Sequence, residues 1–185
     1  MKSNPFYPWK FVKSAYRIPY QKLYDAGYRG IIFDIDNTLT RHGEPADDRV
    51  RELFRELREI GFTTCVVSNN RKERVQKLAE EVDTAYTWKA NKPLPSACQN
   101  AMKLMGTRKE NTFLVGDQLF TDIWCANWAG LKSILVRPIH PKEEIQIVLK
   151  RRLEAPFLWA YICRRLEERA LERKTRRAQK RERKG

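Results

Sequence analysis

Residues 30–40 read GIIFDIDNTLT, and this stretch constrains the fold more than any other part of the chain. An apolar segment, Ile31–Phe33, runs directly into two aspartates that are separated only by Ile35. Burying an ionised carboxylate is costly unless a partner compensates its charge. Residues two apart in an extended segment point to the same side, so Asp34 and Asp36 can face one site. The ordinary alternative is that both are solvated surface groups or helix caps.

Short apolar segments alternate with amphipathic helical segments through the middle of the chain. We expect strands at Ile31–Phe33, Thr63–Val67, Thr84–Trp88, Thr112–Val115 and Ser133–Val136. We expect helices at Arg49–Ile60, Lys72–Glu81, Pro95–Met105 and Asp122–Ala129. This alternation favours a three-layer α/β fold with a mainly parallel sheet. Ligands of such sheets bind beyond the carboxyl ends of the strands, near the topological switch point.

Polar side chains gather at those expected strand ends. They are Asp34 and Asp36, Ser68 and Asn69, Lys92, and Asp117 with Asp122. Carboxylates that converge without histidine or thiolate suit a hard cation, of which Mg²⁺ is the commonest partner. The sequence therefore predicts a site for a metal and a phosphate, which together would satisfy the buried acids.

These motifs resemble those of the haloacid dehalogenase-like (HAD) phosphatase superfamily. The matching pieces are DIDNT at 34–38, Ser68 with Asn69, Lys92, and GDQLFTD at 116–122, in the family's order. A lone DxD is a weak signal, whereas four ordered pieces are a strong one. A closer similarity, carried by the SNN triplet, the KP pair and GDQL-x-TD, is to the YqeG branch, which is related to phosphatidylglycerophosphate phosphatases. The resemblance implies a Rossmann-like HAD core over residues 28–138.

The resemblance also implies catalytic roles for three of these residues. Asp34 would be the nucleophile that forms an aspartyl-phosphate. Asp36 would be the general acid toward the leaving oxygen and then the base for the hydrolytic water. Lys92 would offset the charge of Asp34 and of the phosphoryl oxygens.

Binding roles are implied for the remaining residues. Ser68 and the backbone N–H of Asn69 would bind the phosphoryl oxygens, and Asp122 would support the metal's water shell or Lys92. The Mg²⁺ ligands would be Asp34, Asp117 and the backbone carbonyl of Asp36. Ordinary structural explanations exist as well, since Ser68 could cap a helix and Asp122 could be a favourable charge at a helix start. We expect Asn37, Thr38 and Asn70 to shape loops, and His42 and His140 to be surface residues.

The spacing of the motifs leaves no room for a large cap domain. Only Arg41–Asp48 separates the first motif from the next helix, and one helix with a short strand separates Ser68 from Lys92. Many members of the superfamily close a cap over small substrates. An open site suits a large substrate, a lipid headgroup at a membrane, or closure by a neighbouring subunit.

Charge distinguishes the two ends of the chain from its core. The 185 residues carry 37 Lys+Arg against 23 Asp+Glu, and this net charge of +14 favours a polyanionic neighbour. Half of the excess lies in residues 164–185, with 11 basic and 4 acidic side chains after the apolar run 156–163. We therefore divide the chain into an aromatic and basic segment (1–27), the core (28–138), and an apolar foot with a polybasic helix or tail (139–185).

Each end allows more than one interpretation. The N-terminal aromatics either pack over the sheet edge or contact lipid headgroups. The basic tail could bind an anionic membrane surface, RNA or the ribosome, or could be a solvated helix.

The predicted function is that of a Mg²⁺-dependent phosphate monoester hydrolase acting through an aspartyl-phosphate. Its most concrete substrate is phosphatidylglycerophosphate, a phospholipid that it would convert to phosphatidylglycerol at an anionic membrane surface. The alternatives are an RNA- or ribosome-associated protein on the same fold, and a phosphatase for soluble phosphate esters. Because signal-peptide and membrane-spanning patterns are missing, we expect a cytoplasmic protein, peripheral to the membrane, whose oligomeric state stays open.

Overall fold

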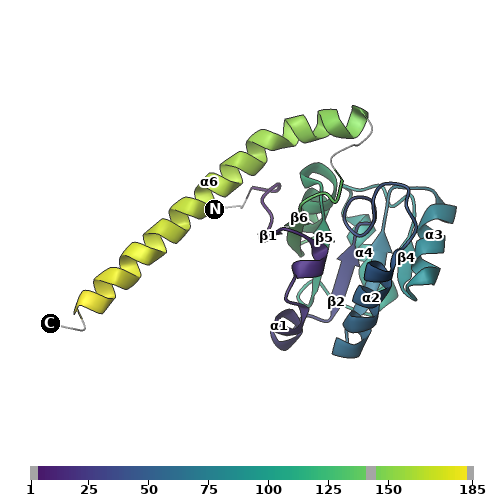
Figure 1. The fold of residues 1–185 in the computed structure, drawn as a ribbon, viewed down its shortest axis with the longest axis horizontal. Coiled ribbons are helices and arrows are strands. Elements are labelled where there is room, and N and C mark those ends of the chain that lie inside the picture. Colours follow the sequence, from purple (N-terminus) through teal and green to yellow (C-terminus); the bar gives the residue numbers. More distant parts are fainter. Residues whose placement is uncertain (1–3, 141–144, 183–185) are drawn as a thin grey trace. The chain divides into compact units, whose positions relative to one another are not determined.

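The computed structural model describes residues 4–140 and 145–182, which divide into two compact units (Figure 1). The first unit ends at Ile145 and contains the sheet with its covering helices. The second begins at Gln146 and is formed by the helix α6 (Ile145–Glu182).

The first unit is built on one parallel sheet of six strands in the order β1-β6-β5-β2-β3-β4. The strands are β1 (Lys10–Val12), β2 (Gly30–Phe33), β3 (Thr63–Val67), β4 (Ala85–Thr87), β5 (Thr112–Gly116) and β6 (Lys132–Val136). The helices are α1 (Tyr20–Asp25), α2 (Asp48–Ile60), α3 (Lys72–Glu81), α4 (Ser96–Met105) and α5 (Trp124–Trp128), with a 3-10 turn η1 (Ala15–Arg17) and a π-helical turn η2 (Leu119–Ile123). The predicted α/β fold with a mainly parallel sheet is confirmed.

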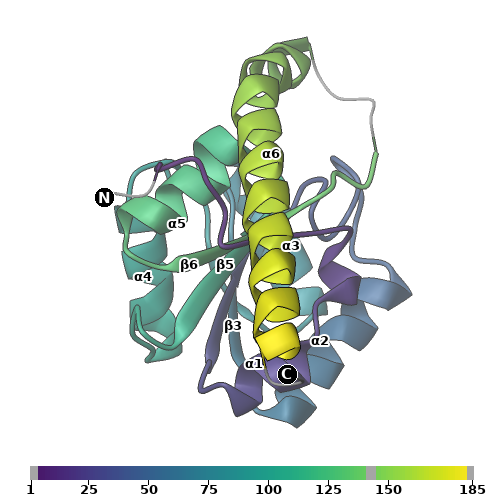
Figure 2. The ribbon, with the colours of Figure 1, turned by 90° about the vertical axis from the view of Figure 1, so that its left-hand side faces the viewer.

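Two hydrophobic layers enclose the sheet because side chains alternate along its strands. Ile31 and Phe33 pack in the cluster that includes Phe54 of α2. Ile32 packs in the opposite cluster with Cys98 of α4. Figure 2 shows α4 and α5 on one side of the sheet, with α1 and α2 on the other. A strand buried on both faces is a continuous apolar run, which explains the GIIF sequence of β2.

Helix α2 has sequence signals at both ends that the structure uses. The Asp47 side chain accepts a hydrogen bond from the Val50 N–H at 2.9 Å and so caps the first turn. Gly61 ends the helix with a φ of 106°, a left-handed conformation that favours glycine. Between these ends, the buried face of α2 packs on the sheet.

The N-terminal segment adds a strand that the sequence did not predict. β1 pairs in parallel with β6 at the edge of the sheet. Before it, the Asn127 side-chain amide donates to the carbonyl oxygens of Pro5 and Tyr7 at 2.6 and 3.0 Å. Sheet-edge packing is therefore one role of this aromatic segment, and lipid contact stays a prediction.

The second unit places the apolar run 156–163 and the basic residues from Arg164 to Arg181 in one helix, α6, which passes through Pro156. Within the described residues, no helix combines the length and apolarity that a bilayer span requires.

We predict that Phe54→Ala lowers the free energy of unfolding by about 3–5 kcal/mol, because it leaves a cavity in the core. The Phe54 ring lies 5.4 Å from that of Phe33, and both side chains are fully buried. Urea unfolding measures the change. The neighbouring Arg55→Ala removes an exposed side chain and should change stability by less than about 0.5 kcal/mol. Equal losses in both variants would contradict this account of the core.

Candidate active site

The site lies at the carboxyl edge of the sheet, at the point where the order in which strands are added to the sheet changes direction. β2 lies between β5 and β3, so the crevice between β2 and β5 is the switch point at which α/β proteins bind ligands. Asp34 directly follows β2, and its N–H donates to the Val115 carbonyl at 2.9 Å. Asp117 directly follows β5. The parallel pairing therefore brings two distant motifs side by side.

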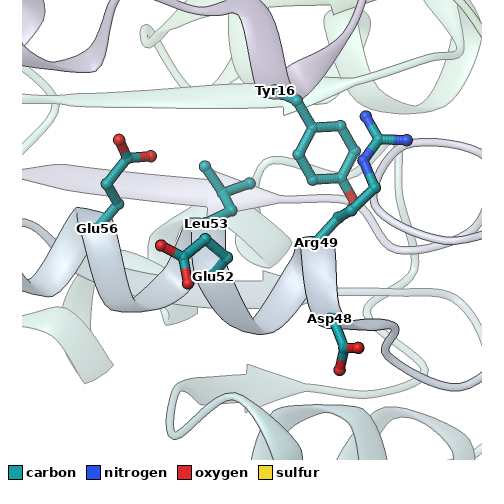
Figure 3. A pocket seen from close by; sticks show the side chains of 6 residues that line it. All are labelled: Tyr16, Asp48, Arg49, Glu52, Leu53 and Glu56. Carbon is teal, nitrogen blue, oxygen red and sulfur yellow. The ribbon is translucent and has the colours of Figure 1, made fainter.

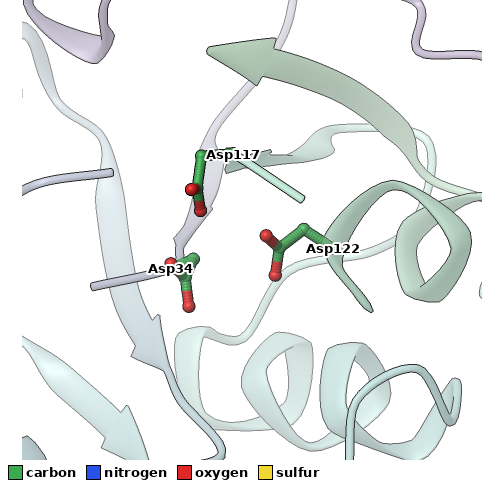
Figure 4. A group of neighbouring side chains, drawn as sticks. All are labelled: Asp34, Asp117 and Asp122. Carbon is green, nitrogen blue, oxygen red and sulfur yellow. The ribbon is translucent and has the colours of Figure 1, made fainter. Parts of the chain in front are cut away.

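Three buried carboxylates converge there, on Asp34, Asp117 and Asp122 (Figure 4). One oxygen of each lies within 4.8 Å of the other two. The ammonium of Lys92 lies beside them and contacts two of the three carboxyl groups. An oxygen-only donor set of this kind fits a hard divalent cation.

Lys92 is the buried cation of this cluster. Its Nζ donates to Oδ1 of Asp34 at 2.6 Å and to Oδ1 of Asp122 at 2.7 Å. Burial alone would lower the pKa of Lys92, but the charges of Asp122 and Asp34 outweigh it and raise that pKa. Burial raises the pKa of Asp34 to about 7, although the charge of Lys92 opposes this rise. The contact therefore keeps Lys92 charged and limits the rise in the pKa of Asp34.

Asp122 is positioned by the turn η2 and by close packing on Gly116. Its Oδ2 accepts a hydrogen bond from the Gln118 N–H at 3.0 Å, while its Oδ1 binds Lys92. A Cβ on Gly116 would overlap the Asp122 side chain and lie 2.6 Å from its Oδ2. Glycine is required here for space. Of the two supporting roles predicted for Asp122, the structure shows the contact with Lys92.

Asn69 joins the second motif to the Lys92 loop. Its side-chain amide donates to the Lys92 carbonyl at 3.0 Å, and its Oδ1 accepts from the Lys92 N–H at 2.8 Å. The sequence assigned only the backbone of Asn69 to the site, so this bridging role was missed. Ser68 is buried, and its Oγ accepts from the Asn70 N–H at 3.1 Å. Phosphate binding by Ser68 and Asn69 stays a prediction.

The carboxyl group of Asp36 accepts hydrogen bonds from donors other than Lys92. Its Oδ1 accepts from the Gly43 N–H at 3.1 Å and from Nη2 of Arg74 at 3.2 Å. Its Oδ2 accepts from the Asn70 amide at 3.2 Å, and Nδ1 of His42 lies 3.7 Å from Oδ1. The sequence placed Asn70 among the loop residues and His42 on the surface, and gave Arg74 no role. Metal contact through the Asp36 backbone carbonyl stays a prediction.

The turn between these motifs also reaches the carboxylate cluster. Asn37 has a φ of 62°, and its N–H donates to the Thr40 carbonyl at 2.7 Å, so it shapes the loop as expected. Thr38 does more than that, because its hydroxyl donates to Oδ1 of Asp117 at 3.2 Å. Thr38 thereby orients a carboxylate that could hold the metal.

A surface pocket of about 470 Å³ lies along α2 (Figure 3). Its lining residues are Tyr16, Asp48, Arg49, Glu52, Leu53 and Glu56. None of the predicted site residues lines it. Three carboxylates against one guanidinium make it unfavourable for a phosphate ester, so we assign no substrate to it.

Comparison with known proteins agrees with this geometry. A family model described as haloacid dehalogenase-like hydrolase matches residues 44–130. The probable phosphatase YqeG of Bacillus subtilis strain 168 is 36% identical over 156 residues, which span 84% of this chain and 91% of that protein. The chain belongs to the haloacid dehalogenase-like hydrolases. The family and the class of enzyme predicted from the sequence are thereby confirmed.

Further comparisons extend this result. Phosphatidylglycerophosphate phosphatase 1 of Arabidopsis thaliana, chloroplastic/mitochondrial, is 27% identical over 177 residues, covering 86% of this chain and 49% of that protein. Crystal structures of uncharacterized proteins from Listeria monocytogenes serotype 4b and Corynebacterium glutamicum each superpose with a TM-score of 0.51, at 15% and 23% identity. They cover 63% and 60% of this chain, and 84% and 86% of their own chains. These two show the fold alone.

We predict that Gly116→Ala lowers phosphate-ester hydrolysis about 100-fold, the scale for loss of one preorganised hydrogen-bond donor. The added methyl group displaces Asp122 and with it Lys92. Steady-state release of p-nitrophenol measures the effect. Gly106→Ala is the control for overlap, since a Cβ there meets no atom within 4 Å, while its φ of 64° makes alanine lower stability without changing the site. It should retain activity per folded molecule, and full activity of Gly116→Ala would refute the packing argument.

Proposed function

We propose that this HAD protein hydrolyses phosphate monoesters through an aspartyl-phosphate formed on Asp34. The observation that carries the proposal is the contact of Lys92 with Oδ1 of Asp34. Among the described residues, Oδ2 of Asp34 has no hydrogen-bond partner, which leaves this oxygen for attack on phosphorus. Lys92 binds one oxygen of the nucleophile and directs the other toward the substrate.

The reaction proceeds in two displacements. Oδ2 of Asp34 forms a bond to phosphorus while the bond from phosphorus to the ester oxygen breaks. The leaving ester oxygen takes a proton from Asp36. Water then attacks the phosphorus of the aspartyl-phosphate and gives its proton to Asp36, which regenerates both aspartates and releases phosphate. Lys92, the Ser68 hydroxyl and the backbone N–H of Asn69 bind the phosphoryl oxygens during both steps.

Mg²⁺ is the cofactor that we propose. Its ligands would be Asp34, Asp117 and the backbone carbonyl of Asp36. Bound there, it would supply positive charge to the phosphoryl oxygens. The convergence of buried oxygen-only donors supports this choice. Both oxygens of Asp122 are already engaged, by Lys92 and by the Gln118 N–H, so Asp122 supports Lys92.

The substrate that we propose is phosphatidylglycerophosphate, reached by a cytoplasmic protein that is peripheral to an anionic membrane. The name of the Arabidopsis relative supports the substrate. The absence of an inserted domain between β2 and α2, and between β3 and β4, supports an open site. In the loop that carries Lys92, Trp88 and Leu94 are 41% and 46% exposed, beside the exposed Lys89. Tryptophan, an apolar side chain and lysine together suit a lipid headgroup region.

We predict Mg²⁺-dependent phosphate release from phosphatidylglycerophosphate in mixed micelles, at a higher kcat/KM than from glycerol phosphate. Asp34→Asn should lower kcat at least about 1,000-fold on every ester, because it removes the nucleophile. Chelation with EDTA should abolish release, and added Mg²⁺ should restore it.

Any other outcome of this assay would point to a different function. Turnover of soluble esters alone would retain the phosphatase and refute the lipid substrate. If nothing is hydrolysed, the proposed function fails, and salt-sensitive retention on RNA would then favour a nucleic-acid partner for the basic helix α6.

We predict that Trp88→Ala combined with Leu94→Ala lowers kcat/KM on lipid in anionic vesicles about tenfold, which corresponds to a loss of about 1.4 kcal/mol of interfacial binding. Hydrolysis of p-nitrophenyl phosphate should be unchanged. Trp128→Ala is the control, because this 55% exposed residue ends α5, which packs beside β6, away from the loop after β4. A loss on vesicles that Trp128→Ala reproduces would argue against a specific membrane-facing loop.

A further inference from the structure

The carboxyl group of Asp36 meets only donors in the described structure. The Gly43 N–H, the Asn70 amide and the Arg74 guanidinium donate to it at 3.1–3.2 Å. These three donors reach both oxygens of the carboxyl group and so fix its position.

Arg74 is fixed at this position by its helix and by a second hydrogen bond. It lies in the first turn of α3, next to the buried Val75, and its side chain is only 18% exposed. Its Nη2 donates both to Asp36 and, at 3.2 Å, to the hydroxyl of Thr40. Its Nε is buried without a hydrogen-bond partner among the described residues, so the two hydrogen bonds of Nη2 are what hold the guanidinium there.

A short chain of hydrogen bonds connects this pair with the phosphate-binding side of the site. The Asn70 side chain donates to Oδ2 of Asp36, and the Asn70 N–H donates to Oγ of Ser68 at 3.1 Å. Asp36 is thus two hydrogen bonds away from the hydroxyl that we assign to the phosphoryl group. Residues 41–45 of the Asp36 loop are exposed, so the loop alone offers the carboxyl group little packing.

We propose that Arg74 is a positioning residue for the second half of the reaction: it holds Asp36 where its carboxylate accepts the proton of the water that cleaves the aspartyl-phosphate. The inference rests on the proposed function. Water adds its oxygen to phosphorus, the bond from phosphorus to Asp34 breaks, and the proton passes to Asp36. Arg74 touches neither water nor phosphate in this account.

The test separates the two half-reactions with p-nitrophenyl phosphate, whose leaving group needs no proton. Arg74→Met removes every donor while keeping the length of the side chain. We expect kcat and KM to fall together, by about 100-fold, the lower end of the range for general acid–base catalysis. Their ratio should stay within about twofold of the wild type, because it reports the first displacement.

Pre-steady-state kinetics make the expectation specific. Arg74→Met should release one equivalent of p-nitrophenolate in a burst and then turn over slowly, with phosphate held on Asp34. Arg74→Lys should restore part of the steady-state rate. Adding Arg74→Met to Asp36→Asn should cause no further loss, because both act on the same step. Arg71→Gln, an exposed arginine of the preceding loop, is the matched control and should behave as the wild type.

A fall in kcat/KM without a burst would overturn the inference, since it would make Arg74 a phosphate ligand or a structural residue. A full additional loss in the Asp36→Asn background would overturn it as well. Failure of the proposed function is distinguishable, because the wild type would then show no turnover sensitive to Asp34→Asn. Equal thermal unfolding midpoints for the variants exclude misfolding as the cause.

Discussion

The buried ammonium of Lys92, shared between Asp34 and Asp122, is the interaction on which the rest of the site depends. Three carboxylates with so little solvent would repel one another strongly without it. Removing one partner of such a buried pair typically costs about 3–5 kcal/mol. Other features of the site serve this contact. Asn69 fixes the Lys92 backbone through two hydrogen bonds, and Gly116 gives Asp122 the space to approach.

The order of the strands explains why four distant motifs can meet at Lys92. β2, β3 and β4 are neighbours on one side, whereas β5 and β6 extend the sheet on the other side of β2. All strands are parallel, so every motif emerges at the same edge. Asp34 and Asp117 come from the two strands that flank the switch point, which is why their carboxyl groups approach most easily there.

Most elements of the first unit could be predicted, because each is a short apolar run or an amphipathic helix with a recognisable end. The structure places α3 at Lys72–Glu81 and β3 at Thr63–Val67, as the periodicity indicated. β1 could not be predicted, since three residues within an aromatic and basic segment carry no alternation and pair only through β6. Arg74 was missed for a similar reason. It is one of many arginines, and only the tertiary fold shows that it reaches Asp36.

Asp34 and Asp36 are separated by one residue and yet have different partners. Lys92 binds Asp34 inside the carboxylate cluster, whereas Arg74 and Asn70 bind Asp36 at its side. A single shared cation would couple the charges of the two acids, so that a change at one would disturb the other. The two acids still interact, because the charge of Asp36 contributes to the raised pKa of Asp34. The DxD spacing brings both acids to one site, and Arg74 of α3 gives Asp36 a cation of its own.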